Sequence, residues 1–151
     1  MKHPIATFAG AAGLAVLGTL LLANSAPDTA APPDRDALVK RGEYIVNGVG
    51  LCADCHTPRG PNGQFIEGMH LKGAAITVAP TVPMPAWATV APWIAGLPAG
   101  WSEEQMARFL VTGERPYEMP AVLPPMPPYR MNDADAAAVS AYLLSLAKTP
   151  K

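Results

Sequence analysis

The chain has 151 residues; half of them are apolar, 15% are charged, and the formal net charge is −1. This balance of charges argues against a nucleic-acid-binding surface or a polybasic membrane patch. The 18 prolines and 13 glycines approach the level of a disordered chain, but the apolar content indicates a folded domain with long, stiff connections. Two cysteines are too few for a disulfide framework, and the length allows one domain with or without a tail.

An almost uninterrupted apolar run from Ile5 to Ala23 follows Lys2 and His3 and contains no charged residue. It predicts that residues 1–26 form either a cleaved secretory signal peptide or a single transmembrane anchor, and both would export the rest of the chain. A buried globular helix is disfavoured because the run has no polar face. Residues 27–33, rich in proline and small residues, are expected to form a linker.

Residues 34–151 are predicted to form one domain with three helices. The first helix covers about Asp34 to Gly50. Its apolar stripe has helical spacing and consists of Leu38, Val39, Gly42, Ile45, Val46 and Val49.

The second helix begins after Ser102, which is followed by Gln105 in the pattern of a capping box, and it ends at Gly113. The third begins after Asn132 and ends near Lys148. The apolar stripes are Met106, Phe109 and Leu110 in the second helix, and Val139, Tyr142, Leu143 and Leu146 in the third.

No alternating strand pattern is visible, so the predicted fold is all-α. Two Pro-rich loops, residues 80–98 and 116–128, take up much of the remaining domain. Three short helices with so much loop would form a weak core on their own. Another component is therefore expected to complete it.

Cys52-Ala53-Asp54-Cys55-His56 is a C-x-x-C-H sequence at the end of the first predicted helix. This spacing is typical of covalent attachment of c-type haem. Thiols three residues apart lie on one side of a helical turn and can reach two positions of one ring. The imidazole of His56 would then bind the iron axially. A buried macrocycle would also supply the apolar mass that the helices lack.

Three other interpretations of the two cysteines are less consistent with the sequence. A thioredoxin-type redox pair would need a βαβ context, which is not visible here. A zinc site would need a fourth ligand from His3 or His70, and His3 lies on the far side of the export segment. A plain disulfide would leave His56 and the small core unexplained.

The identity of a sixth iron ligand would separate an electron carrier from a haem with an open site. The candidates are His70 and the methionines at 69, 84, 106, 119, 126 and 131. Met126 is favoured because it lies between two pairs of prolines, which fix φ and leave the side chain little freedom to lose on ligation. Met119 and Met131 remain the main alternatives.

The sequence resembles the class I cytochromes c of bacteria, in particular the mono-haem modules associated with periplasmic dehydrogenases. The resemblance covers about Val39 to Leu146. It depends on four segments: Arg41–Val46, Cys52–Gly60, Pro125–Pro127 and Tyr142–Leu146.

This resemblance implies a small helical fold around one haem c. Cys52 and Cys55 would carry the thioether bonds, and His56 and Met126 would be the axial ligands. Gly42 and Tyr44 would meet the last helix near Tyr142. Arg59, Trp87, Trp93 and Trp101 are candidate donors to the haem propionates, and carbonyls around Pro58 and Pro61 are candidate acceptors for His56.

The function implied is electron transfer and not catalysis, on the periplasmic side of a bacterial inner membrane. The donor would be a dehydrogenase, and the acceptor an oxidase, another cytochrome or quinone machinery. The N-terminal segment, if uncleaved, would attach the protein to the membrane. The alternative function is that of a haem enzyme or gas sensor with an open sixth coordination site.

Overall fold

The computed structural model describes residues 34–147. The predicted signal or anchor (1–26), the linker (27–33) and the helix end predicted at Lys148 lie outside these residues. The elements are α1 (Arg35–Tyr44), the π-helical segment η1 (Ile45–Val49), α2 (Cys52–His56), β1 (Lys72–Ala75), β2 (Val90–Trp93), α3 (Glu103–Thr112) and α4 (Asp133–Ser145). None of the helices within residues 34–147 has both the length and the apolar character needed to cross a bilayer.

The first predicted helix is confirmed as α1 followed directly by η1. Asp34 caps its start by accepting a hydrogen bond from the backbone N–H of Asp36. Ile45 and Val46 are buried as expected, but Val49 is 66% exposed. The π-helical turn holds more residues than an α-helical turn, so the 3.6-residue spacing that placed Val49 on the buried face does not continue through η1.

Helices α3 and α4 begin where their capping residues predict. Ser102 and Gln105 form a reciprocal capping box at the start of α3, and Gly113 ends it with φ 78°. Asn132 accepts from the backbone N–H of Asp135 at the start of α4. The last helix ends at Ser145, three residues before the predicted end.

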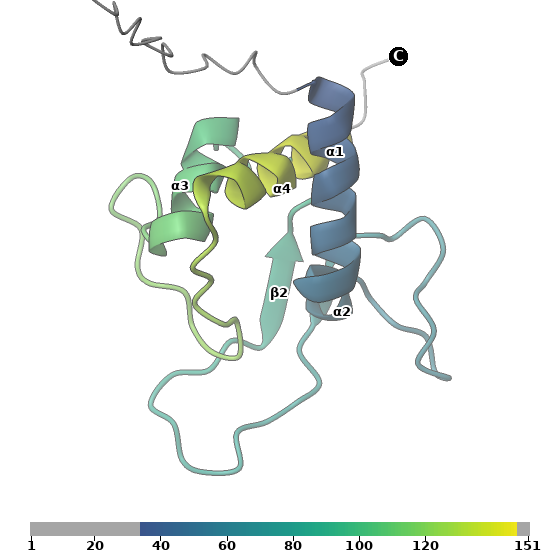
Figure 1. Cartoon of the computed structure of the whole chain (residues 1–151). Coiled ribbons are helices and arrows are strands. Elements are labelled where there is room, and N and C mark those ends of the chain that lie inside the picture. The colour runs from purple at the N-terminus through teal and green to yellow at the C-terminus, as the bar shows by residue number, and fades with distance from the viewer. Residues whose placement is uncertain (1–33, 148–151) are drawn as a thin grey trace, which may run out of the picture. The chain divides into compact units, whose positions relative to one another are not determined.

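Helices α1 and α4 cross, as the two labelled ribbons show in Figure 1, and Gly42 is the residue of α1 at the closest contact. A Cβ atom on Gly42 would lie 2.0 Å from the carbonyl oxygen of Ala138 and 2.7 Å from the Cβ of Tyr142. Only glycine allows the two backbones to approach this closely. The expected contact of Gly42 with the last helix is therefore confirmed, whereas Tyr44 is 56% exposed and lies under the guanidinium of Arg41.

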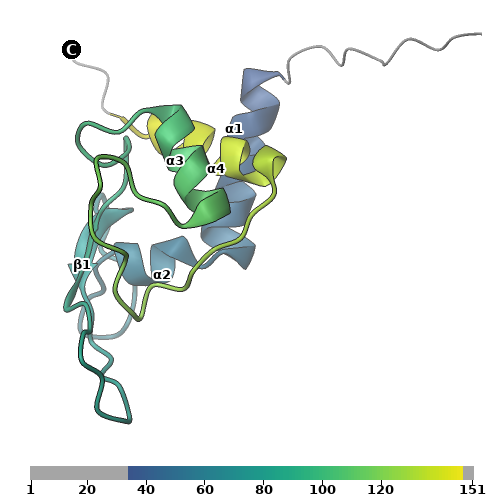
Figure 2. The same ribbon diagram turned by 90° about the vertical axis from the view of Figure 1, so that its left-hand side faces the viewer.

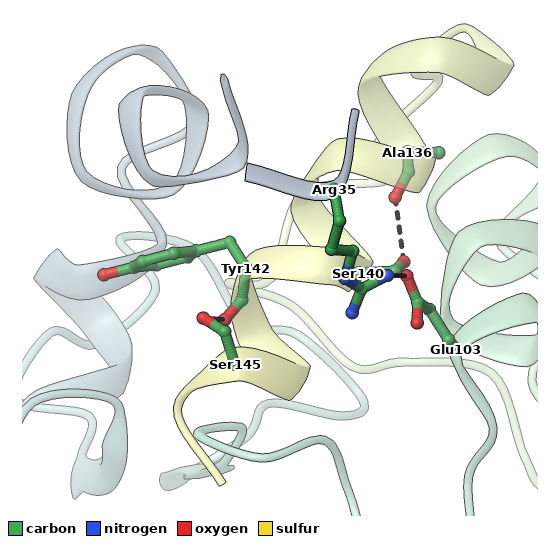
Figure 3. A network of polar contacts seen from close by, with 6 residues as sticks. All are labelled: Arg35, Glu103, Ala136, Ser140, Tyr142 and Ser145. Atoms are coloured by element: carbon green, nitrogen blue, oxygen red, sulfur yellow. Dashed lines mark hydrogen bonds and ion pairs between the residues drawn. The ribbon is translucent and has the colours of Figure 1, made fainter. Parts of the chain in front are cut away.

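Ion pairs link the helices around this crossing. Arg35 of α1 lies 2.5 Å from Glu103 of α3 (Figure 3), and Arg41 of α1 lies 3.0 Å from Asp135 of α4. Both pairs are largely exposed and contribute about 0–1 kcal/mol each. In the interior, the Ser140 hydroxyl donates to a carbonyl one turn earlier in α4. The helix arrangement consequently depends on close apolar packing more than on charge.

The prediction of an all-α fold is wrong in one respect, because β1 and β2 pair in an antiparallel sheet. Lys72 lies opposite Trp93, and Ala75 opposite Val90. Strand β2 falls inside the loop predicted over residues 80–98. Its central residues are alanine and proline, and β1 is mostly glycine and alanine, so neither strand has the alternating pattern by which strands are found.

The core lies between α1, α3 and α4 and extends to the sheet. Its fully buried side chains include Val46, Leu71 and Val139, and the expected stripes of α3 and α4 contribute Met106, Leu110, Tyr142 and Leu143. Figure 2 shows the loop between α3 and α4 curving past α2 before it returns to α4. This loop carries Met126 and brings it to the side of the domain where α2 lies.

Candidate haem site

The C-x-x-C-H motif forms its own short helix, α2, and not the end of the first helix as predicted. Leu51 has a left-handed conformation, with φ 53°, and turns the chain between η1 and α2. His56 is 6% exposed, Cys52 is partly exposed and Cys55 is exposed. The single turn thus presents both thiols and the imidazole to the same cleft.

This cleft has a volume of about 520 Å³, within the range of cofactor and ligand sites. Its walls come from α2, β2, α3, α4 and the α3–α4 loop and are mostly apolar. Potential haem-binding atoms line it: the sulfurs of Cys52 and Cys55, the ring of His56, and the thioethers of Met106, Met119 and Met126. Two thiols, an imidazole and a thioether around an apolar cleft are a donor set that fits a covalently attached haem.

The His56 ring is oriented by strand β2. Its Nδ1 lies 2.7 Å from the carbonyl oxygen of Pro92. A carbonyl can only accept, so Nδ1 carries the proton and Nε2 is left with a lone pair for a metal. Burial lowers the pKa of His56, which also favours the neutral, ligating form. Pro92 thus fills the role expected of the carbonyls near Pro58 and Pro61; the Pro58 carbonyl accepts from Ile66 instead.

The cleft narrows the choice of a sixth ligand. Met126 and Met119 line it, as does Met106, which is 4% exposed in the core. In the described part of the chain, Met69, Met84, Met131 and His70 do not contribute to its walls. His70 instead lies 3.2 Å from the hydroxyl of Tyr142 through its Nε2 atom.

Tyr129, which the sequence reasoning missed, lines the cleft next to Cys52. Its hydroxyl donates to the Gly50 carbonyl just before α2. Burial, followed by the neighbouring Cys52, raises the pKa of Tyr129 to about 12. Burial likewise raises the pKa of Cys52. A tyrosine three residues after Met126 is the only sequence signal for this contact, and it is weak.

Among the four candidate propionate donors, only Trp101 lines the cleft. It contacts Phe109 edge to face, with ring centroids 5.5 Å apart. The indole of Trp87 donates to the Val78 carbonyl across the hairpin, and that of Trp93 donates to the Ala95 carbonyl just after β2.

Arg59, the fourth of these candidates, forms an ion pair with Asp54 at 2.7 Å and lies over the ring of Phe65. Arg115, which was not among the candidates, does line the cleft. Apart from His56, it is the one ionisable basic side chain on the cleft wall within residues 34–147.

Neither a disulfide between the two cysteines nor a zinc site that includes them is present within residues 34–147. No disulfide joins Cys52 to Cys55. No cluster of three or more His, Cys, Asp and Glu side chains able to hold a metal ion occurs in that range.

Comparisons with known proteins identify the family of this domain. A family described as Cytochrome c matches residues 39–147. The chain is 39% identical over 83 residues to the protein of Gluconobacter oxydans (strain 621H) named alcohol dehydrogenase (quinone), cytochrome c subunit, covering 52% of this chain and 16% of that protein. Proteins of the same name from Gluconacetobacter polyoxogenes and Komagataeibacter europaeus are 30% identical over 140 residues, covering 87% of this chain and 29% of theirs.

The chain therefore spans less than a third of the length of these relatives. The family match covers most of the domain, including the C-x-x-C-H motif and the Met126 segment. The chain belongs to the cytochrome c family, with covalently bound haem c as its cofactor and electron transfer as its role.

Proposed function

We propose that the protein is a mono-haem electron carrier in which Cys52 and Cys55 form the thioether bonds and His56 and Met126 are the axial ligands. The observation that supports this best is that all four side chains line one apolar cleft, although Met126 is 70 residues from His56 in the sequence. Haem bound there would supply a one-electron ferric–ferrous couple. The residues that line the cleft would hold the haem and determine the polarity around it.

The cleft favours a reduced iron. Its walls are mostly apolar, and a low dielectric disfavours the additional positive charge of the ferric state. The thioether of Met126 is a neutral, soft ligand that stabilises ferrous iron. The Pro92 carbonyl keeps His56 in the orientation needed for ligation through Nε2.

The relatives suggest the redox partner. They are named as cytochrome c subunits of quinone alcohol dehydrogenases. By analogy, this domain would accept electrons from a dehydrogenase on the periplasmic side of the inner membrane. It would pass them to an oxidase, another cytochrome or quinone machinery. Residues 1–26 would act as a signal peptide or as an anchor that keeps the domain near membrane partners.

Replacement of Met126 tests the ligand assignment and separates the two functions. In haem-loaded protein we expect Met126→Ala to lose the sulfur-to-iron charge-transfer band of the ferric form and to bind carbon monoxide rapidly when ferrous. Met119→Ala, which removes another thioether from the cleft, is the matched control and should retain the band. If wild-type ferrous protein already binds carbon monoxide rapidly and its ferric form lacks the band, the open-site haem enzyme or sensor is the better description; equally slow binding in wild type and Met126→Ala would mean that another residue is the ligand.

A further inference from the structure

Strand β2 has one edge paired with β1 and a second edge that pairs with no other strand within residues 34–147. Ala91 lies opposite Ala74, and the N–H of Ile76 donates to the Thr89 carbonyl at 2.9 Å. In an antiparallel pair, alternate residues direct their N–H and C=O groups toward the partner strand. Thr89 and Ala91 therefore face β1, whereas Ala88 and Pro92 direct their backbone groups away from it.

This second edge, continued two residues before β2 to Ala88, makes two hydrogen bonds, one to each segment that bears a proposed axial ligand. The carbonyl of Pro92 accepts from Nδ1 of His56 at 2.7 Å. Four residues earlier, the N–H of Ala88 donates to the carbonyl of Pro124 at 2.7 Å. Pro124 is two residues before Met126. A single strand edge thus connects the His56 segment to the Met126 segment.

The hairpin that carries Ala88 is closed at its base. The Ile76–Thr89 hydrogen bond extends the β1–β2 ladder by one pair. The indole Nε1 of Trp87 donates to the Val78 carbonyl at 3.1 Å, across the same hairpin. These bonds fix the backbone on both sides of Ala88, so its N–H meets Pro124 at a defined position.

We propose that Ala88 and Pro92, here called the β2 clamp, position the two axial ligands relative to each other, and that Ala88 is the positioning residue for the Met126 loop. This inference rests on the proposed ligation by Met126. Residues 119–129 belong to no helix or strand, so they are held by isolated bonds, such as that of Tyr129 to Gly50, and the Ala88 bond is the one that lies two residues from the ligand. His56 is already held by α2, so loss of the Ala88 bond should loosen the methionine side and leave the histidine side in place.

Replacement of Ala88 by proline tests the clamp because proline removes the N–H donor. The β1–β2 ladder does not use this N–H. The control is Ala86→Pro, which puts the same ring two residues earlier, at an N–H with no hydrogen-bond acceptor in the described part of the chain. In haem-loaded, full-length protein we measure the rate at which carbon monoxide binds the ferrous form, since ligand entry requires the thioether to leave. A bond worth about 1 kcal/mol predicts a roughly fivefold faster rate for Ala88→Pro and no change for Ala86→Pro.

Two more conservative variants test the same contact if Ala88→Pro does not fold. Trp87→Phe removes the hydrogen bond to Val78 but keeps an aromatic ring, and we expect a smaller increase in the same rate. Trp93→Phe removes the indole hydrogen bond to the Ala95 carbonyl. Trp93 does not line the cleft, so this variant should leave the rate unchanged. Thermal unfolding of each variant shows whether the effect is local.

The outcomes distinguish the clamp from the ligand assignment. If Met126→Ala binds carbon monoxide much faster than wild type while Ala88→Pro and Trp87→Phe match their controls, the clamp is refuted and the ligation stands. If wild type and Met126→Ala bind at the same rate, the ligand assignment fails and the clamp fails with it. A faster rate in Ala88→Pro, with Ala86→Pro at the wild-type rate, supports both.

Discussion

The close contact of α1 with α4 predicts that Gly42→Ala lowers the free energy of unfolding. The added methyl group would lie 2.0 Å from the carbonyl oxygen of Ala138 and 2.6 Å from its carbon. Ordinary van der Waals contact begins near 3.4 Å, so the helices must separate by more than 1 Å. Both of these atoms are backbone, and no rotamer change can relieve the contact.

The free-energy change combines two effects of opposite sign. Overpacking of a core costs about 1–3 kcal/mol and sometimes more, and a backbone clash of this size should cost about 3–4 kcal/mol. Alanine in place of glycine inside a helix contributes about 1 kcal/mol of stability. The free energy of unfolding should therefore fall by about 2–3 kcal/mol. With a slope of about 4 kcal/mol/M in guanidinium chloride, the midpoint should fall by about 0.5–0.75 M.

The assay is guanidinium unfolding of the haem-loaded protein, followed by circular dichroism. Gly48→Ala is the matched control, because its methyl group would meet only the ring of Tyr44 at an ordinary 3.6 Å. We expect the control to change stability by no more than about 1 kcal/mol. An unfolding midpoint for Gly42→Ala equal to that of wild type would refute the argument that the crossing requires glycine.

Three further predictions concern capping, pH and salt. Ser102→Ala removes one half of the capping box at α3 and should lower the free energy of unfolding by about 1 kcal/mol in the same denaturation assay; no change would mean that the box does not stabilise the helix. Because burial raises the pKa of Tyr129 to about 12 in the folded state, its contribution to stability is complete below pH 10 and is lost as pH rises from 10 toward 12. Tyr129→Phe should reduce this alkaline slope in a pH series of unfolding curves, and an unaltered slope would contradict it. The rate of electron transfer should depend only weakly on ionic strength, since residues 73–102 and 119–129, which supply much of the cleft wall, contain no charged side chain; a steep fall with salt, measured by stopped-flow, would contradict this.

Local signals in the sequence predict the helices and the haem-binding motif well. Ser102 with Gln105 sets the start of α3 and Gly113 sets its end, and each signal lies within one turn of the end that it sets. The start of α4 is likewise marked by Asn132, with Asp133 and Asp135 in the first turn. Such features are recognisable because cause and effect lie within a few residues. The C-x-x-C-H motif is of the same kind.

Contacts between distant segments are where the sequence prediction is incomplete. The acceptor for His56 is Pro92, 36 residues away, and proline gives no local sign that its carbonyl will be used in this way. Strands β1 and β2 stabilise each other by pairing, and their glycine, alanine and proline residues have little intrinsic strand preference. The π-helical turn of η1 also places Val49 outside the core, although the spacing of apolar residues in the sequence is that of a regular α-helix.

The close approach of Gly42 to Ala138 also joins the two ends of the described fold. The two residues are 96 positions apart in the sequence, so their contact closes a long loop whose entropic cost the packing of α1 on α4 must offset. Cys52 and Cys55 lie within that loop, shortly after η1. A chain that ends before α4 would therefore keep the C-x-x-C-H motif but lack the surface against which α1 packs.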